Sequence, residues 1–335
     1  MSLDSLGRPL RDLRISVTDR CNFRCTYCMP REIYGRDFEF LPREELMTFE
    51  EIARLGQLFA QLGVEKVRLT GGEPLLRRDI ESLIEMLSHV KGIRDLTMTS
   101  NGSLLTREKA RALKDAGLSR ISISLDSLDD DVFRAMNDVN FPVGKVLDAI
   151  DAANEAQLWP IKVDMVVKRG INENSILDMA SHFRGTGHIV RFIEYMDVGT
   201  TNGWRMEEVV PSREVVERIA AQWPIEAVNP NYFGEVAERY RYRDGAGEFG
   251  IISSVTQPFC GSCTRARLTA DGKLYLCLFA TEGHDLLQLL RRRATDEEMV
   301  DEIRAIWRVR DDRYSEIRSS ETTGLHKVEM SRIGG

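Results

Sequence analysis

The 335-residue chain has no long apolar run. None of its hydrophobic stretches approaches the roughly 18 to 20 residues that span a bilayer, and its start, MSLDSLGRPLRDLR, lacks an apolar signal core. We therefore expect a cytoplasmic protein with no membrane partner. The chain also lacks an excess of positive charge. Its net charge of -7 argues against a broad nucleic-acid surface, although a local basic pocket for one polyphosphate remains compatible with it.

Histidine and cysteine are both scarce. There are five histidines and six cysteines. The cysteines fall into two groups of three, and the first group, within RCNFRCTYCMP, has the spacing Cys-x3-Cys-x2-Cys. The first cysteine group is Cys21, Cys25 and Cys28, and the second cysteine group is Cys260, Cys263 and Cys277.

Three kinds of site could use such groups. A disulfide framework is typical of small secreted chains, which this large chain does not resemble. Structural zinc is four-coordinate, so each group would need a further ligand; His284 could supply one to the second group, but no histidine is near the first. A 4Fe-4S cluster usually binds one cysteine per iron, so three cysteines leave one iron open to another ligand.

The first two hundred residues alternate β-rich runs with helical patterns. EELMTFEEIARLGQLFAQLG, residues 44–63, is the clearest helix, because its apolar residues recur every three or four positions. Repeated βα units predict a parallel sheet, either open or curled into a partial barrel, with a ligand site at the carboxyl ends of its strands. The predicted strands are Leu13–Thr18, Lys66–Thr70, Asp95–Ser100, Arg120–Leu125, Ile161–Val167 and Ile189–Tyr195.

The alternation stops near residue 200. Two hairpins are predicted, with turns at residues 244–247 and 271–272, and Thr295 with Glu298 predicts a capped final helix. The second hairpin should return Cys277 to the neighbourhood of Cys263. Arg265 and Arg267 lie two apart on its first strand and therefore share one face, beside the cysteines.

Basic residues also alternate on the predicted barrel strands. Arg14 is on the first strand, and Lys66 and Arg68 are on the second. Strand residues of a barrel point inward and outward by turns, and a charge on the inner face needs a partner. A triphosphate is one such partner.

Several motifs resemble known families. The first cysteine group, with Tyr27 before its last cysteine, and the string LTGGEPLLR resemble the radical S-adenosylmethionine superfamily; the two glycines of LTGGEPLLR let the backbone approach a ligand closely. VTDRCNFRCTYCMP, KVRLTGGEPLLR, VRFIEYM, PFCGSCTRARLTADGKLYLCLFA and the final Gly334-Gly335, in this order, resemble the GTP 3′,8-cyclase family of molybdenum cofactor biosynthesis. The resemblance runs from about residue 11 to the end of the chain.

The resemblance implies an α/β fold and a reaction. Residues 1–200 would form an incomplete (β/α)6 TIM-like barrel, and residues 201–335 an α+β part with a second 4Fe-4S cluster. Two 4Fe-4S clusters and S-adenosylmethionine would be the cofactors. The enzyme, a lyase, would convert GTP to 3′,8-cyclo-7,8-dihydro-GTP, because a 5′-deoxyadenosyl radical removes the ribose 3′ hydrogen and the ribose radical attacks guanine C8.

The resemblance also implies partners. They are GTP, an external electron donor, the downstream cyclic pyranopterin monophosphate synthase and a second copy of the chain in a homodimer, with no nucleic acid. Two other functions stay open: a radical S-adenosylmethionine enzyme acting on a peptide or other substrate, and a non-enzymatic iron–sulfur or zinc protein.

The resemblance also assigns roles to residues at matching positions of this sequence. Tyr27, Gly72, Ser124 and Met196 match S-adenosylmethionine contacts. GTP contacts are matched by Arg14, Arg68, Thr99, Lys162, Arg265 and Arg267, with Lys66, Arg191, Gly334 and Gly335 as further candidates. Two features depart from the family pattern: Asp164, where asparagine is frequent, and residues 136–146. The final glycines have no Cβ, and we expect them to thread into the active site.

Overall fold

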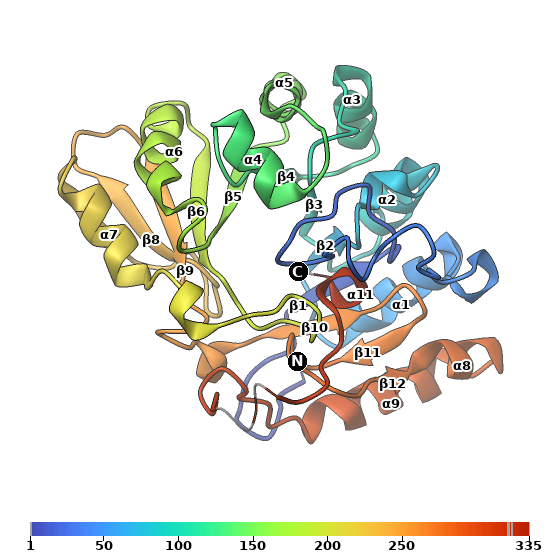
Figure 1. The fold of residues 1–335 in the computed structure, drawn as a ribbon. Helices are drawn as coiled ribbons and strands as arrows, with labels where there is room; N and C mark the ends of the chain where they lie inside the picture. The colour runs from blue at the N-terminus through green and yellow to red at the C-terminus, as the bar shows by residue number, and fades with distance from the viewer. Residues whose placement is uncertain (1, 320–321, 323, 335) are drawn as a thin grey trace.

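Six parallel strands form the middle of one curved sheet (Figure 1). The computed structural model describes residues 2–319, 322 and 324–334. Each strand predicted in the first two hundred residues is present, within two residues of its predicted ends. The strands are β1 Asp12–Ser16, β2 Lys66–Thr70, β3 Asp95–Ser100, β4 Arg120–Ser124, β5 Lys162–Val167 and β6 Ile189–Glu194.

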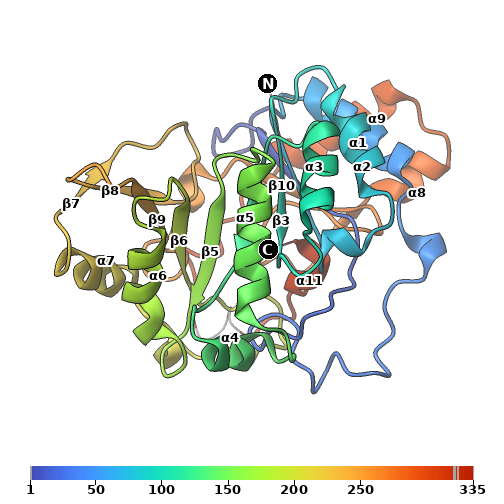
Figure 2. The same ribbon diagram turned by 90° about the horizontal axis from the view of Figure 1, so that it is seen from above.

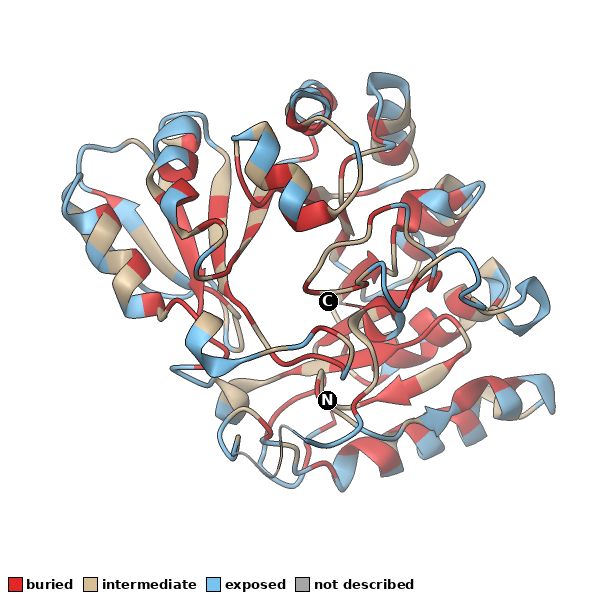
Figure 3. Ribbon diagram, viewed as in Figure 1, coloured by how far each residue is buried: buried red, intermediate tan, exposed pale blue. Residues whose placement is uncertain are grey.

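Helices cover the convex side of this sheet (Figures 1 and 2). Alternate strand residues face them: Leu13 and Ile15 of β1 are fully buried in the apolar core, and Arg14 between them faces the concave side. Burial is accordingly concentrated on the strands and on the inward helix faces (Figure 3). The helices are α1 Phe49–Gln61, α2 Ile80–Ser88, α3 Arg107–Asp115, α4 Asp130–Asn137, α5 Val143–Glu155 and α6 Ile176–Phe183.

The predicted start of the first helix is wrong. Residues 43–45 form a separate 3-10 turn, and α1 begins only at Phe49. The reason is a capping box: the Thr48 hydroxyl accepts from the Glu51 amide at 3.2 Å, and the Glu51 carboxylate accepts from the Thr48 amide at 2.8 Å.

The C-terminal strands join the same sheet at both of its edges. Both predicted hairpins are present, since β8 pairs antiparallel with β9 and β10 with β11. In addition, β9 pairs parallel with β6 and β10 pairs parallel with β1, which local turn signals could not predict. The sheet thus stays open, as an incomplete barrel. These strands are β7 Ile225–Val228, β8 Glu238–Tyr242, β9 Glu248–Ile252, β10 Arg265–Leu268, β11 Lys273–Tyr275 and β12 His284–Asp285.

Further α-helices in the described part of the chain are α7 Ser212–Ala220, α8 Leu286–Arg291, α9 Asp296–Arg308 and α11 Met330–Ile333. The predicted capping box of Thr295 and Glu298 opens α9. The short α11 lies against β1. Among the described residues, no helix is long and apolar enough to cross a membrane.

Candidate functional site

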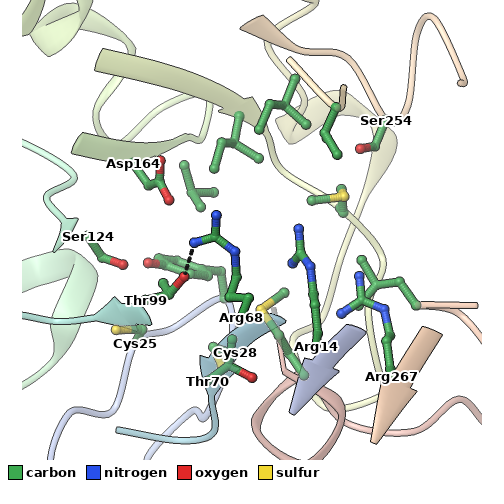
Figure 4. Close-up of a pocket in the computed structure, with 18 of the residues that line it drawn as sticks. Arg14, Cys25, Cys28, Arg68, Thr70, Thr99, Ser124, Asp164, Ser254 and Arg267 are labelled. Atoms are coloured by element: carbon green, nitrogen blue, oxygen red, sulfur yellow. Dashed lines mark hydrogen bonds between the residues drawn. The ribbon is translucent and has the colours of Figure 1, made fainter. Parts of the chain in front are cut away.

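Both cysteine groups line one cavity of about 280 Å³ on the concave side of the sheet. The cavity lies at the carboxyl ends of the strands, where the βα pattern predicts a ligand site. Its walls also carry basic side chains from β1, β2 and β10 (Figure 4). The two cysteine groups therefore share one cavity, although their nearest members, Cys28 and Cys260, are 232 residues apart in the sequence.

The first cysteine group occupies the loop after β1. Backbone bonds shape this loop: the amides of Cys28 and Met29 donate to the Cys25 carbonyl at 2.9 and 2.8 Å. Burial raises the pKa of the Cys21 thiol to about 11 and holds the pKa values of Cys25 and Cys28 well above their usual range. The neighbouring thiols add to the rise for Cys25 and Cys28, so the three sulfurs are close enough to interact.

The loop after β2 packs directly on this cysteine loop. The Gly72 amide donates to the Thr18 carbonyl and the Glu73 amide to the Arg20 carbonyl, both at 2.8 Å. A Cβ on Gly72 would overlap the Arg20 carbonyl and lie 2.8 Å from the Cys21 nitrogen. The close approach that this glycine permits is therefore to the cysteine loop itself, a partner that the sequence pattern could not reveal.

Two buried carboxylates support the cavity wall, and neither was predicted as a site residue. Asp126 accepts from the Tyr27 hydroxyl and from the Val166 amide, both at 2.9 Å. Glu73 accepts from the Ser100 hydroxyl at 2.8 Å. Burial raises the pKa of each carboxyl to about 7. The available signal was that Asp126 lies only two residues beyond Ser124, where β4 ends.

The second cysteine group lies in different surroundings. Arg267 of β10 lies opposite Tyr275 of β11, so Cys277, two residues further on, lies beside Arg265. The hairpin predicted from the sequence gives the same placement. The Cys263 sulfur accepts from the guanidinium groups of Arg265 and Arg310, both at 3.1 Å. Burial would raise the pKa of this thiol, but the two cations lower it to about 6. Burial raises the pKa of Cys277 to about 11.

The spacing of the second cysteine group is also compatible with zinc, with His284 as a fourth ligand. His284 is exposed on β12. Within residues 2–319, 322 and 324–334, no three His, Cys, Asp or Glu side chains are placed to hold a single metal ion. In an iron–sulfur cluster each thiolate binds a different iron, so the sulfurs need not converge on one point.

A row of arginines crosses the cavity. Register aligns Arg267 of β10, Arg14 of β1 and Arg68 of β2, and their side chains point into the same space (Figure 4). Burial and mutual repulsion lower the pKa of Arg68 to about 9 and of Arg267 to about 10. Among the described residues, Arg14 has no side-chain hydrogen bond or ion pair. Incompletely compensated cations at this depth favour an anionic ligand.

Arg68 and Arg191 differ in whether a carboxylate of the protein pairs with their charge. Arg68 donates to the hydroxyls of Thr99 at 2.7 Å and Ser122 at 3.1 Å. Arg191 forms a two-pronged ion pair with Asp164, both bonds at 2.5 Å. The charge of Arg191 is thus balanced within the protein. Asp164, noted as unusual in the sequence, is the residue that balances it.

Lysines continue the basic lining toward the start of the strands. Lys66 and Lys162 line a smaller cavity that shares Arg14, Arg68 and Arg265 with the first. Lys66 donates to the Tyr232 hydroxyl at 2.6 Å, a contact that the sequence did not predict. Burial, reinforced by neighbouring arginines, lowers the pKa of Lys162 to about 7.

The C-terminal segment also reaches the cavity. Met330 lines the cavity, and Gly334, at a φ of +75°, packs so tightly on Thr70 that a Cβ would overlap the threonine hydroxyl. Arg267 donates to the Gly334 carbonyl. Gly335 lies outside the described residues.

The structure brings together most of the predicted site. Both cysteine groups line the large cavity, Lys66 and Lys162 line the smaller one, and Gly334 contacts Thr70 and Arg267. Arg310, Asp126 and Tyr232 also line these cavities, although the sequence did not predict them as site residues. The other predicted residues on the large cavity are Arg14, Tyr27, Arg68, Gly72, Thr99, Ser124, Arg191, Met196, Arg265 and Arg267.

Comparisons with known proteins identify the class of protein. Residues 15–183 match the radical SAM superfamily, and residues 188–316 match the family described as Molybdenum Cofactor Synthesis C. Streptococcus suis SuiB bound to S-adenosylmethionine has the same fold, with a TM-score of 0.63 at 16% identity over 89% of this chain and 68% of that one. The partial barrel with its three-cysteine loop is thus that of a radical S-adenosylmethionine protein.

Comparison with curated relatives shows the family within this superfamily. The chain is 52% identical to a GTP 3′,8-cyclase of Acidothermus cellulolyticus, over 99% of this chain and 98% of the relative. It is 49% and 48% identical to those of Staphylococcus saprophyticus and Staphylococcus aureus, with the same coverage. The chain belongs to the GTP 3′,8-cyclase family.

Proposed function

We propose that this protein converts GTP to 3′,8-cyclo-7,8-dihydro-GTP, the first step of molybdopterin biosynthesis. The observation that carries the proposal is the shared cavity, in which two three-cysteine groups flank a row of incompletely compensated arginines. One group suits a radical-generating cluster, and the arginines suit the triphosphate of a nucleotide. The same proposal includes a cytoplasmic location and a homodimer. It also includes an external electron donor and delivery of the product to cyclic pyranopterin monophosphate synthase.

Each cysteine group would hold one 4Fe-4S cluster. Both groups fit this cofactor chemically, because their partly buried thiols line the wall of a cavity and leave room for a ligand that is not a cysteine. When bound, the first cluster would pass an electron from the external donor to S-adenosylmethionine, which would release methionine and supply a 5′-deoxyadenosyl radical to take the ribose 3′ hydrogen. The ribose carbon would then bond to guanine C8, and uptake of a further electron and a proton would give the dihydro product.

Residues beside the first cysteine group would position S-adenosylmethionine. Tyr27, Gly72, Ser124 and Met196 line the cavity that holds this group. The hydrogen bond from Tyr27 to buried Asp126 fixes the direction of the aromatic ring, so Asp126 acts on the cofactor through Tyr27. Fixed geometry matters because a small displacement of reacting atoms costs rate steeply.

The basic lining would hold GTP. Arg14 has no ion-pair partner among the described residues and offers a planar guanidinium to phosphate oxygens. Thr99 steadies Arg68, and Lys66 and Lys162 extend the positive charge along the strands. Arg265 lies between this lining and Cys263, where it would place the base beside the second cluster.

One anaerobic incubation tests the proposal. The reconstituted protein is mixed with dithionite and S-adenosylmethionine, with GTP, with ATP or with no nucleotide. We expect 5′-deoxyadenosine and a cyclised guanosine product with GTP, and no cyclised product with ATP. Cys25→Ala is the matched control and should form neither. Formation of 5′-deoxyadenosine only after a peptide is added would replace the cyclase by a peptide-modifying enzyme.

A further inference from the structure

The loop after β6 contacts both the cavity and the C-terminal tail. We call residues 196–202 the β6 loop and residues 329–334 the tail. Met196, at the start of the β6 loop, lines the large cavity. Asn202, at its end, donates to the carbonyls of Met196 at 3.0 Å and of Tyr27 at 3.4 Å. The β6 loop is thereby tied to the cysteine loop on one side of the cavity.

Glu329 fastens the tail to this loop. Its carboxylate accepts from the Thr200 amide at 2.9 Å, the Thr200 hydroxyl at 3.0 Å and the Thr201 hydroxyl at 2.7 Å. All of these donors are neutral, and among residues 2–319, 322 and 324–334 no cation pairs with Glu329. The carboxylate is therefore recognised by its shape and position rather than by an opposite charge.

Gly199 makes room for that carboxylate. It has a φ of +72°, and a Cβ there would overlap a carboxylate oxygen and lie 2.7 Å from the Glu329 Cδ. Gly203 has a φ of +60° just beyond the β6 loop, yet a Cβ on it would meet nothing within 4 Å. We call the contact of Glu329 with Thr200 and Thr201 the clamp. A glycine is required at 199 to leave room for the clamp, whereas at 203 it is required only for the backbone conformation.

A second anchor holds the segment before the tail to the same loop. Buried Asp197 accepts from Lys327 at 2.9 Å, Arg318 at 3.0 Å and Tyr314 at 2.5 Å. Beyond Glu329 the chain passes Met330, which lines the cavity, and reaches Gly334 on Thr70. Among the described residues, Glu329 is the last side chain that hydrogen-bonds the tail to the β6 loop before the chain enters the cavity.

We infer that Glu329 is a positioning residue, which seats the tail against the β6 loop and so joins the tail to the cofactor side of the site. This inference rests on the proposed function. Loss of the clamp should leave 5′-deoxyadenosine formation intact and reduce its conversion into cyclised product, because the cavity would no longer hold the ribose in register with the radical.

The test compares two ways of breaking the clamp with two matched controls. Glu329→Ala removes the carboxylate without stranding a buried cation, and Gly199→Ala displaces the carboxylate without changing it. Gly203→Ala imposes similar backbone strain without touching Glu329, and Glu302→Gln removes one exposed charge from α9. Glu329→Gln keeps one acceptor oxygen and should lie between the wild type and Glu329→Ala.

Cyclised product per 5′-deoxyadenosine should fall by about tenfold to a hundredfold in both clamp variants. In both controls this ratio should stay within about twofold of wild type, and iron content and GTP affinity should be preserved in all variants. The double variant should be no worse than either clamp variant alone, because both act through one contact. An unchanged ratio in Glu329→Ala and Gly199→Ala overturns the inference.

Hydrogen exchange separates this inference from the proposed function. Amides of residues 324–334 should exchange faster in the two clamp variants than in the wild type and the Gly203→Ala control. If the wild type forms no cyclised product while these amides loosen as expected, the proposed function is wrong and the clamp is real. If the amides do not loosen, the clamp is wrong whatever the activity.

Discussion

The two cysteine groups line one cavity but differ in their electrostatic surroundings. In the first, burial raises the pKa of each thiol, and the sulfur of Cys21 accepts from neutral donors, the Phe23 amide at 3.4 Å and the Asn101 amide group at 3.8 Å. In the second, two arginines hold the pKa of Cys263 near 6. Burial thus favours the neutral form of the thiols in the first group, whereas the two arginines favour the thiolate of Cys263 in the second.

The two sites also differ in how the chain builds them. The first cysteine group lies on one short loop. The second depends on Arg310, which follows α9 and donates to the Cys263 carbonyl at 2.8 Å and to Asp4 at 3.1 Å. Asp4 in turn binds Arg8, which donates to the Cys260 carbonyl at 2.9 Å. Both ends of the chain thus support the second site, and changes far away in sequence should disturb it selectively.

Removing each cysteine group should give the largest and clearest contrast. Anaerobic reconstitution of the wild type should load about eight irons per chain, and either triple alanine variant about four. Loss of Cys21, Cys25 and Cys28 should abolish S-adenosylmethionine cleavage. Loss of Cys260, Cys263 and Cys277 should spare cleavage and abolish cyclisation. Zinc retained at the second group after anaerobic reconstitution would show that only one cluster exists.

Replacing Arg310 should remove the second cluster alone. Arg310→Met leaves the Cys263 sulfur with one charged donor fewer, removes the donor to the Cys263 carbonyl and leaves Asp4 paired with Arg8 alone. We expect iron to fall from about eight toward about four per chain, with S-adenosylmethionine cleavage preserved. Exposed Arg308 on α9 offers the control Arg308→Met. Full iron and an unaltered electron paramagnetic resonance spectrum in Arg310→Met would mean that Arg310 does not support the cluster.

Arg267 should affect GTP binding more than either cluster. Arg267→Ala should keep about eight irons and weaken GTP binding by roughly 1.5 to 3 kcal/mol, the range for a hydrogen bond to a charged group. Because Arg267 also donates to Gly334, the same substitution is made in a chain lacking Gly334 and Gly335. That truncation alone should spare iron and GTP affinity and reduce product strongly. Unchanged affinity in equilibrium dialysis would remove Arg267 from the GTP site.

The sequence predicts one of these sites far better than the other. The first cysteine group is local, and the predicted strands place it correctly at the carboxyl end of β1. Arg310 and Asp4 are 306 residues apart, and no periodicity marks either one as part of a site. Likewise the parallel pairings of β10 with β1 and β9 with β6 depend on long-range register, which turn residues do not encode. Local chemistry was therefore predictable, and its distant support was not.

The smallest expected effect is a pH dependence of GTP binding at the basic end of the cavity. Burial, together with Arg191, Arg120 and Arg68, lowers the pKa of Lys162 to about 7, and burial lowers that of Lys66 to about 8. A bound triphosphate favours the charged form of each lysine and raises its pKa, so binding takes up protons. The affinity is then highest below the pKa of the free protein and declines as the pH rises through it.

Between about pH 6.5 and about pH 8.5 we expect the dissociation constant for GTP to rise roughly tenfold, since the pKa of Lys162 lies within that interval. Equilibrium dialysis at the two pH values measures it. Lys162→Met should bind more weakly at the lower pH and lose most of the slope, while exposed Lys145→Met should behave as wild type. Ionisation of the terminal phosphate of GTP acts in the opposite direction and is common to all three proteins. Equal slopes in Lys162→Met and wild type would place the proton uptake elsewhere and remove Lys162 from contact with the triphosphate.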